Sequence, residues 1–188
     1  MPNLVDVTYA QTGQSLSINK MGMREMQARA FEERNAQYLL LKAPPAAGKS
    51  RALMFLGLDK LFNQGLKKVI VSVPERSIGG SFDRTNLTTH GFFADWDFNP
   101  SYNLCTPVGE SSKVAAFKNF LNESSETILI CTHATLRFAF DAVEESVFND
   151  TLLAIDEFHH ISVDVGNRLG EVLRFIMNNT TAHIIAMT

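Results

Sequence analysis

Short apolar runs alternate with segments of helical spacing along most of the chain. Runs such as Val69-Ile70-Val71 and Ile128-Leu129-Ile130 lack the alternation of a half-exposed strand, which is typical of strands buried on both faces. Leucines such as Leu53 and Leu56 recur at helical spacing. The predicted strands are 38–42, 68–73, 102–106, 127–131, 152–155 and 183–187, and the predicted helices are 49–63, 113–122, 133–145 and 167–178.

This alternation predicts an α/β fold. Strands that alternate with helices need crossover connections, which favour a mostly parallel sheet with helices on both faces. The weakly patterned stretch 77–101 is expected to contain a long loop. Ligands of such sheets bind beyond the carboxyl ends of the strands, so the residues that follow each apolar run are the place to look for chemistry.

The composition is that of an ordinary globular domain. A length of 188 residues, with 45% hydrophobic and 20% charged residues, predicts one domain with its own core. Cys105 and Cys131 lack metal-ligand spacing, so buried thiols are expected. The formal net charge of -3 gives no electrostatic sign of nucleic acid. The absence of a leader-like start and of a membrane-spanning apolar stretch predicts a cytoplasmic protein without membrane contact.

One segment has the pattern of a phosphate-binding loop: Ala43-Pro44-Pro45-Ala46-Ala47-Gly48-Lys49-Ser50. Its small residues let main-chain N–H groups surround a phosphate at a helix start. Lys49 would contact the β and γ phosphates of ATP, and the Ser50 hydroxyl would ligate Mg²⁺. Ala43 replaces the first glycine of the usual pattern, which requires that its φ is not positive. The predicted ATP-binding residues here are Pro45, Ala46, Ala47, Gly48, Lys49, Ser50 and Arg51.

A second segment delivers two carboxylates at the end of an apolar strand. The run 151–155 is followed by Asp156 and Glu157, which is a Walker B arrangement. Asp156 is expected to hold Mg²⁺, and Glu157 to orient the water that attacks the γ phosphate. His159 and His160 also suggest zinc, but no third and fourth ligand stands at a familiar spacing.

The run Asp156-Glu157-Phe158-His159 resembles motif II of the DEAD/DEAH-type superfamily 2 helicases and translocases. The phosphate loop resembles motif I, and Met187-Thr188 resembles the start of motif III, so the likeness covers most of the chain. It implies a RecA-like P-loop NTPase fold that uses ATP and Mg²⁺. In the family, the histidine at the position of His159 links the nucleotide site to motif III. We therefore expect Glu157, Lys49 and His159 to be catalytic.

The resemblance also assigns residues to the base and to nucleic acid. Met23-Arg24-Glu25-Met26-Gln27 is similar to the family's adenine-reading element, which makes Arg24 and Gln27 candidate ATP ligands. The loops after strands 68–73 and 127–131 resemble motif Ia and the region before motif II. They imply contacts to a DNA or RNA backbone through Pro74, Arg76, Thr132 and His133. Equally, Pro74 could simply end a strand, and Thr132 could simply cap a helix.

The family works with two RecA-like domains, and only the first has a counterpart here. Residues 1–188 are expected to form that one domain, with 1–37 as an amino-terminal segment that carries the adenine-reading element. A second RecA-like domain of the full-length protein is the expected partner, because it supplies the arginine finger. The chain looks like a fragment that binds ATP but hydrolyses it slowly by itself.

Three functions are compatible with these residues. The leading one is the ATPase domain of a nucleic-acid helicase or translocase. The second is a double-stranded DNA translocase of a restriction system, favoured by the Asp-Glu-Phe-His run and by Asn167-x-Leu169-Gly170. The third is a nucleotide-dependent module that regulates a protein partner, which is favoured by the missing basic patch and by the exposed-looking aromatic stretch 92–98.

Overall fold

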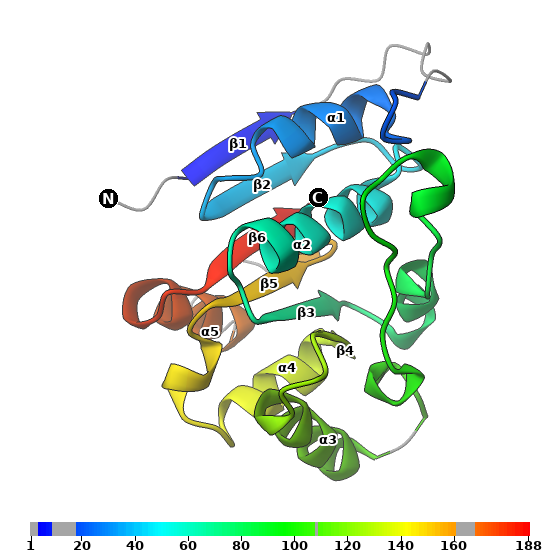
Figure 1. Cartoon of the computed structure of the whole chain (residues 1–188). Coiled ribbons are helices and arrows are strands. Elements are labelled where there is room, and N and C mark those ends of the chain that lie inside the picture. The colour runs from blue at the N-terminus through cyan, green and yellow to red at the C-terminus, as the bar shows by residue number, and fades with distance from the viewer. Residues whose placement is uncertain (1–3, 9–17, 108, 161–167) are drawn as a thin grey trace.

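The computed structural model describes residues 4–8, 18–107, 109–160 and 168–188. Within these residues, six strands form one sheet in the order β1-β2-β6-β5-β3-β4, and every neighbouring pair is parallel (Figure 1). The strands are β1 (Leu4–Thr8), β2 (Tyr38–Lys42), β3 (Lys68–Val73), β4 (Ile128–Thr132), β5 (Thr151–Ile155) and β6 (His183–Met187). The expected α/β fold with a parallel sheet is confirmed.

Helices cover both faces of the sheet (Figure 1). One core cluster joins α1, α2 and the long segment after β3 to one face, while the other joins α3, α4 and α5 to the opposite face. The α-helices are α1 (Glu25–Glu32), α2 (Lys49–Asn63), α3 (Glu110–Asn122), α4 (His133–Phe140) and α5 (Arg168–Asn179). Every residue of β3, β4 and β5 is buried, as their unbroken apolar runs predicted.

The long segment after β3 is made of short 3-10 turns and irregular chain, as expected for 77–101. These turns are η1 (Arg76–Phe82), η2 (Thr88–His90) and η3 (Pro100–Tyr102), and two more, η4 (Glu145–Phe148) and η5 (Phe158–His160), follow later. Trp96 holds this segment together, because it is fully buried and its indole N–H donates to the carbonyl of Phe82 in η1 at 2.9 Å.

Some predicted elements are corrected. The strand predicted at 102–106 is wrong, because this segment forms only one isolated bridge, Asn103 to Ile130, and Pro100 opens a 3-10 turn just before it. The edge strand β1 was not predicted, since its five residues alternate between exposed and half-buried and present no apolar run. α4 ends at Phe140, five residues earlier than predicted. Asn167 and part of the segment 1–37 lie outside the described residues.

The register of the sheet brings the carboxyl ends of its central strands to one edge. Leu41 pairs with Met187, Ile155 pairs with both Ala186 and Ser72, and the loops that follow these strands therefore lie side by side. In the described parts of the chain, no helix is long and apolar enough to cross a membrane.

His183, the first residue of β6, introduces a pH-sensitive group into the fold. Its Nδ1 is buried without a hydrogen-bond partner, and burial, helped by nearby Lys60 and opposed by Asp150, lowers the pKa of the ring to about 4. The folded protein therefore keeps this ring neutral at a pH where the unfolded chain has already taken up a proton.

We expect His183 to weaken the fold as the pH falls from about 6.5 to about 4. Relative to a His183→Leu variant, the wild-type protein should lose unfolding free energy across this window, by at most about 1.4 kcal/mol per pH unit. Urea denaturation of both proteins at pH 7, 6 and 5 measures the difference. Parallel pH dependences of the two proteins would contradict this role of His183.

Candidate functional site

The loop between β2 and α2 is held tightly at its start and turns sharply at its end. Ala43 N–H donates to the Thr188 carbonyl at 3.1 Å, and Thr188 N–H donates to the Leu41 carbonyl at 2.9 Å. Ala43 is not among the residues with positive φ, so the alanine is tolerated here as expected. The left-handed positions are Ala46, with φ 62°, and Gly48, with φ 87°, which precedes the first turn of α2.

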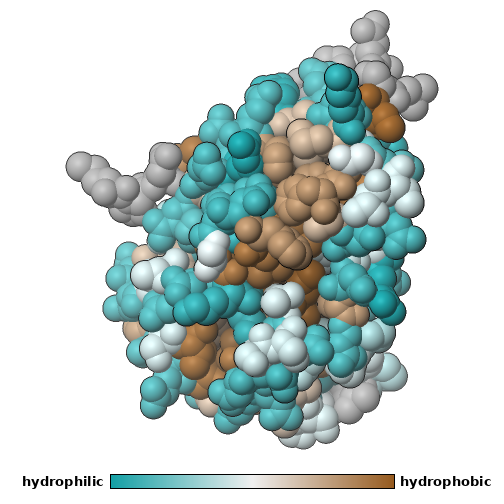
Figure 2. Space-filling model, viewed as in Figure 1, coloured by the Kyte–Doolittle hydropathy of each residue, from teal (hydrophilic) through white to brown (hydrophobic). Residues whose placement is uncertain are grey.

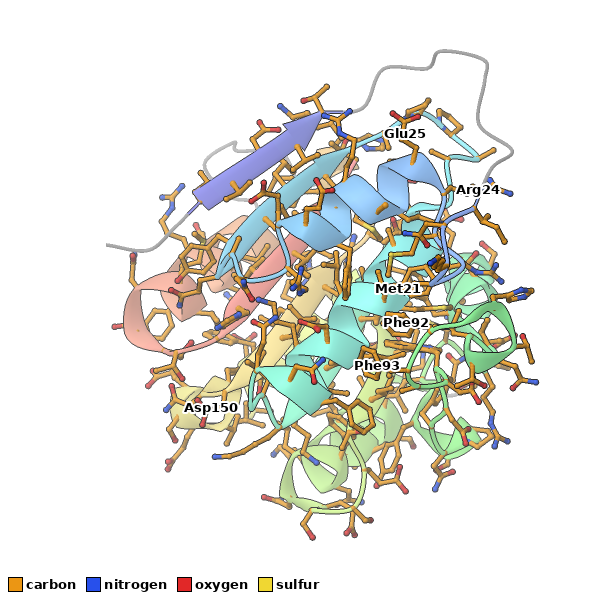
Figure 3. The ribbon with its side chains drawn as sticks, turned by 45° about the horizontal axis from the view of Figure 1, so that its top comes forward. Met21, Arg24, Glu25, Phe92, Phe93 and Asp150 are labelled. Atoms are coloured by element: carbon orange, nitrogen blue, oxygen red, sulfur yellow. The ribbon has the colours of Figure 1, made fainter. Side chains whose placement is uncertain are left out.

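Gln27 on α1 is tied to this loop. Its Nε2 donates to the Gly48 carbonyl at 3.1 Å, and its Oε1 accepts from the Arg24 N–H at 2.8 Å. Glycine suits position 48 because of its positive φ, and a Cβ there would lie 2.5 Å from Gln27 Nε2 and displace that side chain. Arg24 Nη1 reaches the Ala46 carbonyl at 3.4 Å from the start of α1 (Figure 3).

The two carboxylates after β5 face the same space as the loop. Asp156 is buried, and burial raises the pKa of its carboxyl although the Glu157 N–H donates to Oδ1 at 2.9 Å. Glu157 adopts φ 49°, a left-handed backbone that turns its side chain out of the strand direction. Its Oε1 lies 3.4 Å from Lys49 Nζ. Both adjacent carboxylates therefore reach one cavity, as expected at a strand end.

His159 connects Glu157 with the end of β6. Its Nδ1 lies 3.2 Å from Glu157 Oε2 and 3.1 Å from the Thr188 hydroxyl. A histidine in this position touches both the acidic pair and the residue that follows the last strand. The catalytic role expected for His159 from the family resemblance stays a prediction.

A cavity of about 530 Å³ gathers these groups at the edge of the sheet. Its lining combines the loop before α2, the acidic pair and the end of β6 with two residues of η1. It is lined by Ala43, Pro45, Ala46, Gly48, Lys49, Ser50, Ile78, Ser81, Asp156, Glu157, His159 and Thr188. Ile78 and Ser81 were missed from the sequence because they come from a segment without strand or helix periodicity.

A second cavity, of about 390 Å³, adjoins the first at Gly48. It is lined by Ile18, Gly22, Arg24, Gln27, Gly48, Arg51 and His90. Ile18 and His90 were missed from the sequence. Gly22 and Gly91, both with positive φ, could have signalled that two turns pack closely here.

A third cavity, of about 440 Å³, brings together three of the four residues predicted to contact nucleic acid. Pro74, Arg76 and Thr132 line it, together with Glu75, Ser77, Glu110 and Ala134. The Thr132 hydroxyl also accepts from the Thr135 N–H at 3.2 Å, so its capping role is real. Glu110 pairs with the buried Lys113 at 3.0 Å.

His133 is placed differently from these three. Its ring links β3 to the residue that follows β5, with Nδ1 at 2.7 Å from the Ser72 hydroxyl and Nε2 at 3.1 Å from the Asp156 carbonyl. Both ring nitrogens are therefore engaged inside the domain rather than directed into the third cavity.

The cysteines and the aromatic stretch are largely core elements. Cys131 is buried and Cys105 is half-buried, and no group of three or more His, Cys, Asp or Glu side chains that could hold a metal ion occurs among the described residues. Phe92 is buried beside α2, whereas Phe93 is half exposed (Figure 3). Phe93 stacks edge-on with the exposed Phe62. Apolar residues form a band on the face of the molecule that α2 covers (Figure 2).

Comparisons with known proteins relate the sequence and the fold of this chain to helicases. A family model described as "DEAD/DEAH box helicase" matches residues 24–188. The chain is 62% identical over its whole length to the "Putative ATP-dependent helicase YeeB" of Bacillus subtilis (strain 168), of which it spans 31%. The fold is similar to that of the UvsW helicase from bacteriophage T4, with a TM-score of 0.55 and 18% identity over 87% of this chain and 51% of that one.

The contacts of Gln27 lead to a stability prediction. In a Gln27→Glu variant, a carboxylate oxygen would face the Gly48 carbonyl, so a buried hydrogen bond would become a repulsive contact. We expect a loss of about 1–3 kcal/mol of unfolding free energy, measured by chemical denaturation. Gln27→Met, which removes both hydrogen bonds without adding charge, is the matched control. A Gln27→Glu variant as stable as the wild-type protein would contradict the contact.

Proposed function

The chain belongs to the DEAD/DEAH box helicase family, and we propose that it is the ATP-binding, first RecA-like domain of a longer nucleic-acid helicase or translocase. The observation that carries the proposal is the convergence of Lys49, Ser50, Asp156 and Glu157 on one 530 Å³ cavity. A basic side chain, a hydroxyl and two carboxylates at the amino end of a helix form a set of groups suited to a triphosphate and its metal ion.

The residues around the cavity fit ATP and Mg²⁺. The Ser50 hydroxyl and the buried Asp156 carboxylate are hard oxygen ligands, which Mg²⁺ prefers. Main-chain N–H groups at the start of α2 would hold the phosphates, with Pro45, Ala46, Ala47 and Gly48 forming the loop around them. Lys49, now within 3.4 Å of Glu157, would turn to the β and γ phosphates.

The remaining roles follow from the contacts. Glu157 would orient the attacking water once Lys49 has moved to the phosphates, and His159 would connect that step to Thr188. The base would occupy the adjoining 390 Å³ cavity beside Arg24, Gln27 and Arg51. Gln27 already uses both amide atoms on main-chain groups, so we propose that it shapes this cavity as well as bordering the base.

The chain spans 31% of the length of its Bacillus subtilis relative. The helicase or translocase activity of the full-length protein is therefore proposed here. We propose that residues 1–188 act as one domain, and that a second RecA-like domain completes the ATP site with an arginine finger. The chain by itself would then bind ATP and Mg²⁺ but hydrolyse ATP slowly.

DNA or RNA would run over the third cavity, at the loops after β3 and β4. Support comes from the grouping of Pro74, Arg76 and Thr132 around that cavity, where Ser77 also lies, directly before Ile78 of the ATP cavity. Arg76 supplies the positive charge, while main-chain groups and hydroxyls would contact the sugar-phosphate backbone. The ring of His133 would support this loop from inside instead of contacting the nucleic acid.

Two substitutions separate binding from hydrolysis. Lys49→Ala should weaken the binding of a fluorescent ATP analogue by at least about tenfold, because the phosphates lose their cationic partner. Glu157→Gln should leave the affinity of this chain for the ATP analogue unchanged. It should abolish ATP hydrolysis in the full-length protein, because only the water-orienting carboxylate is removed. An equal loss of binding in both variants would show that this division of roles is wrong.

Arg76→Ala tests the nucleic-acid surface. We expect weaker binding to single- and double-stranded DNA and RNA, with the slope of log affinity against log salt reduced by about one. Arg174→Ala, which removes an exposed charge from α5, should change neither quantity and is the control. Fluorescence anisotropy at several salt concentrations gives both values. No binding of the wild-type protein to any nucleic acid, with or without ATP, would instead favour a nucleotide-dependent module that regulates a protein partner.

A further inference from the structure

The peptide group between Asp156 and Glu157 is held at both of its ends. Its N–H, from Glu157, donates to Asp156 Oδ1 at 2.9 Å, and its C=O, from Asp156, accepts from His133 Nε2 at 3.1 Å. The backbone N–H of Asp156 donates to the Ser72 carbonyl at 2.9 Å. The turn that carries both carboxylates is therefore anchored to β3 and α4.

The hydrogen-bond partners of His133 define which of its ring nitrogens carries the hydrogen. A carbonyl oxygen can only accept, so Nε2 carries a hydrogen and donates it to Asp156. In the neutral ring, Nδ1 then accepts from the Ser72 hydroxyl at 2.7 Å. Ser72 thus orients the ring, and the ring orients the peptide.

These hydrogen bonds hold Glu157 in an unusual backbone conformation. Its φ of 49° is a conformation that non-glycine residues seldom adopt, and it persists only when surrounding contacts enforce it. The same peptide group presents the N–H that occupies Asp156 Oδ1, which leaves the other carboxylate oxygen free of this hydrogen bond. If the peptide rotated, the carboxylate would lose its orientation.

We propose that His133 is a positioning residue, which fixes the Asp156–Glu157 peptide and so aims the Asp156 carboxylate at the metal ion of the ATP site. The inference rests on the proposed function, because it assumes that ATP binds with Mg²⁺ in the 530 Å³ cavity. Residues that orient a metal ligand in this indirect way typically change metal affinity by about 10- to 100-fold when they are replaced.

His133 also begins α4 directly after Thr132, which lines the cavity proposed for nucleic acid. One residue therefore contacts the metal-binding turn through its ring and continues the nucleic-acid loop through its backbone. A displacement of that loop would move the ring that holds Asp156.

The test is the effect of Mg²⁺ on the affinity of this chain for a fluorescent ATP analogue, a readout that does not depend on hydrolysis. His133→Ala should lose about tenfold of the enhancement by Mg²⁺ while keeping the metal-free affinity within about twofold of the wild-type value. His133→Gln should retain most of the enhancement, because an amide can donate to Asp156 and accept from Ser72. Ser72→Ala should lose part of it, whereas Ser111→Ala, at an exposed position on α3, should lose none.

The outcomes test the positioning role of His133 separately from the proposed function of the chain. An unchanged Mg²⁺ enhancement in a folded His133→Ala variant, verified by its thermal unfolding, would overturn the positioning role alone. Equal losses with and without Mg²⁺ would also overturn it, because the ring would then act on the nucleotide or on the whole fold. Should His133→Ala fail to fold, an unchanged enhancement in Ser72→Ala would have the same meaning. Absence of any Mg²⁺ enhancement in the wild-type chain would overturn the proposed function together with this inference.

Discussion

The parallel register of the central strands is the constraint on which the site depends. Because β2, β3, β5 and β6 end at nearly the same level, the loops that follow them meet without any long excursion of the chain. The central strands β3 and β5 are buried along their whole length, so this part of the sheet is closely packed. Lys49, Asp156 and Thr188, which are far apart in the sequence, become neighbours around one cavity as a direct result.

Two loops at the carboxyl ends of the strands contain backbone conformations that are unusual for residues other than glycine. Ala46 and Glu157 both have positive φ without being glycine, and both line the same cavity. Side chains contact the main chain at both positions: Arg24 reaches the Ala46 carbonyl, and His133 bonds to the carbonyl of the peptide before Glu157. The chemistry that we propose thus depends on residues which themselves would contact neither the phosphates nor the metal ion.

The sequence predicted the parts of the site that carry a local pattern. The phosphate loop and the acidic pair follow apolar strands, so their positions at the sheet edge could be inferred before their contacts were known. The edge strand β1 and the false strand at 102–106 show where periodicity fails, because short or half-exposed segments are decided by tertiary pairing. Ile78 and the inward-facing ring of His133 depend on packing between distant segments, for which a single sequence carries no signal.

A crystal structure of the chain with Mg²⁺ and a non-hydrolysable ATP analogue tests the central claim most directly. We expect Lys49 Nζ to leave Glu157 and to contact the β and γ phosphates. Ser50 and Asp156 should hold the metal ion, and the base should lie beside Gln27. A nucleotide bound elsewhere, or Lys49 still paired with Glu157 while the nucleotide is present, would contradict it.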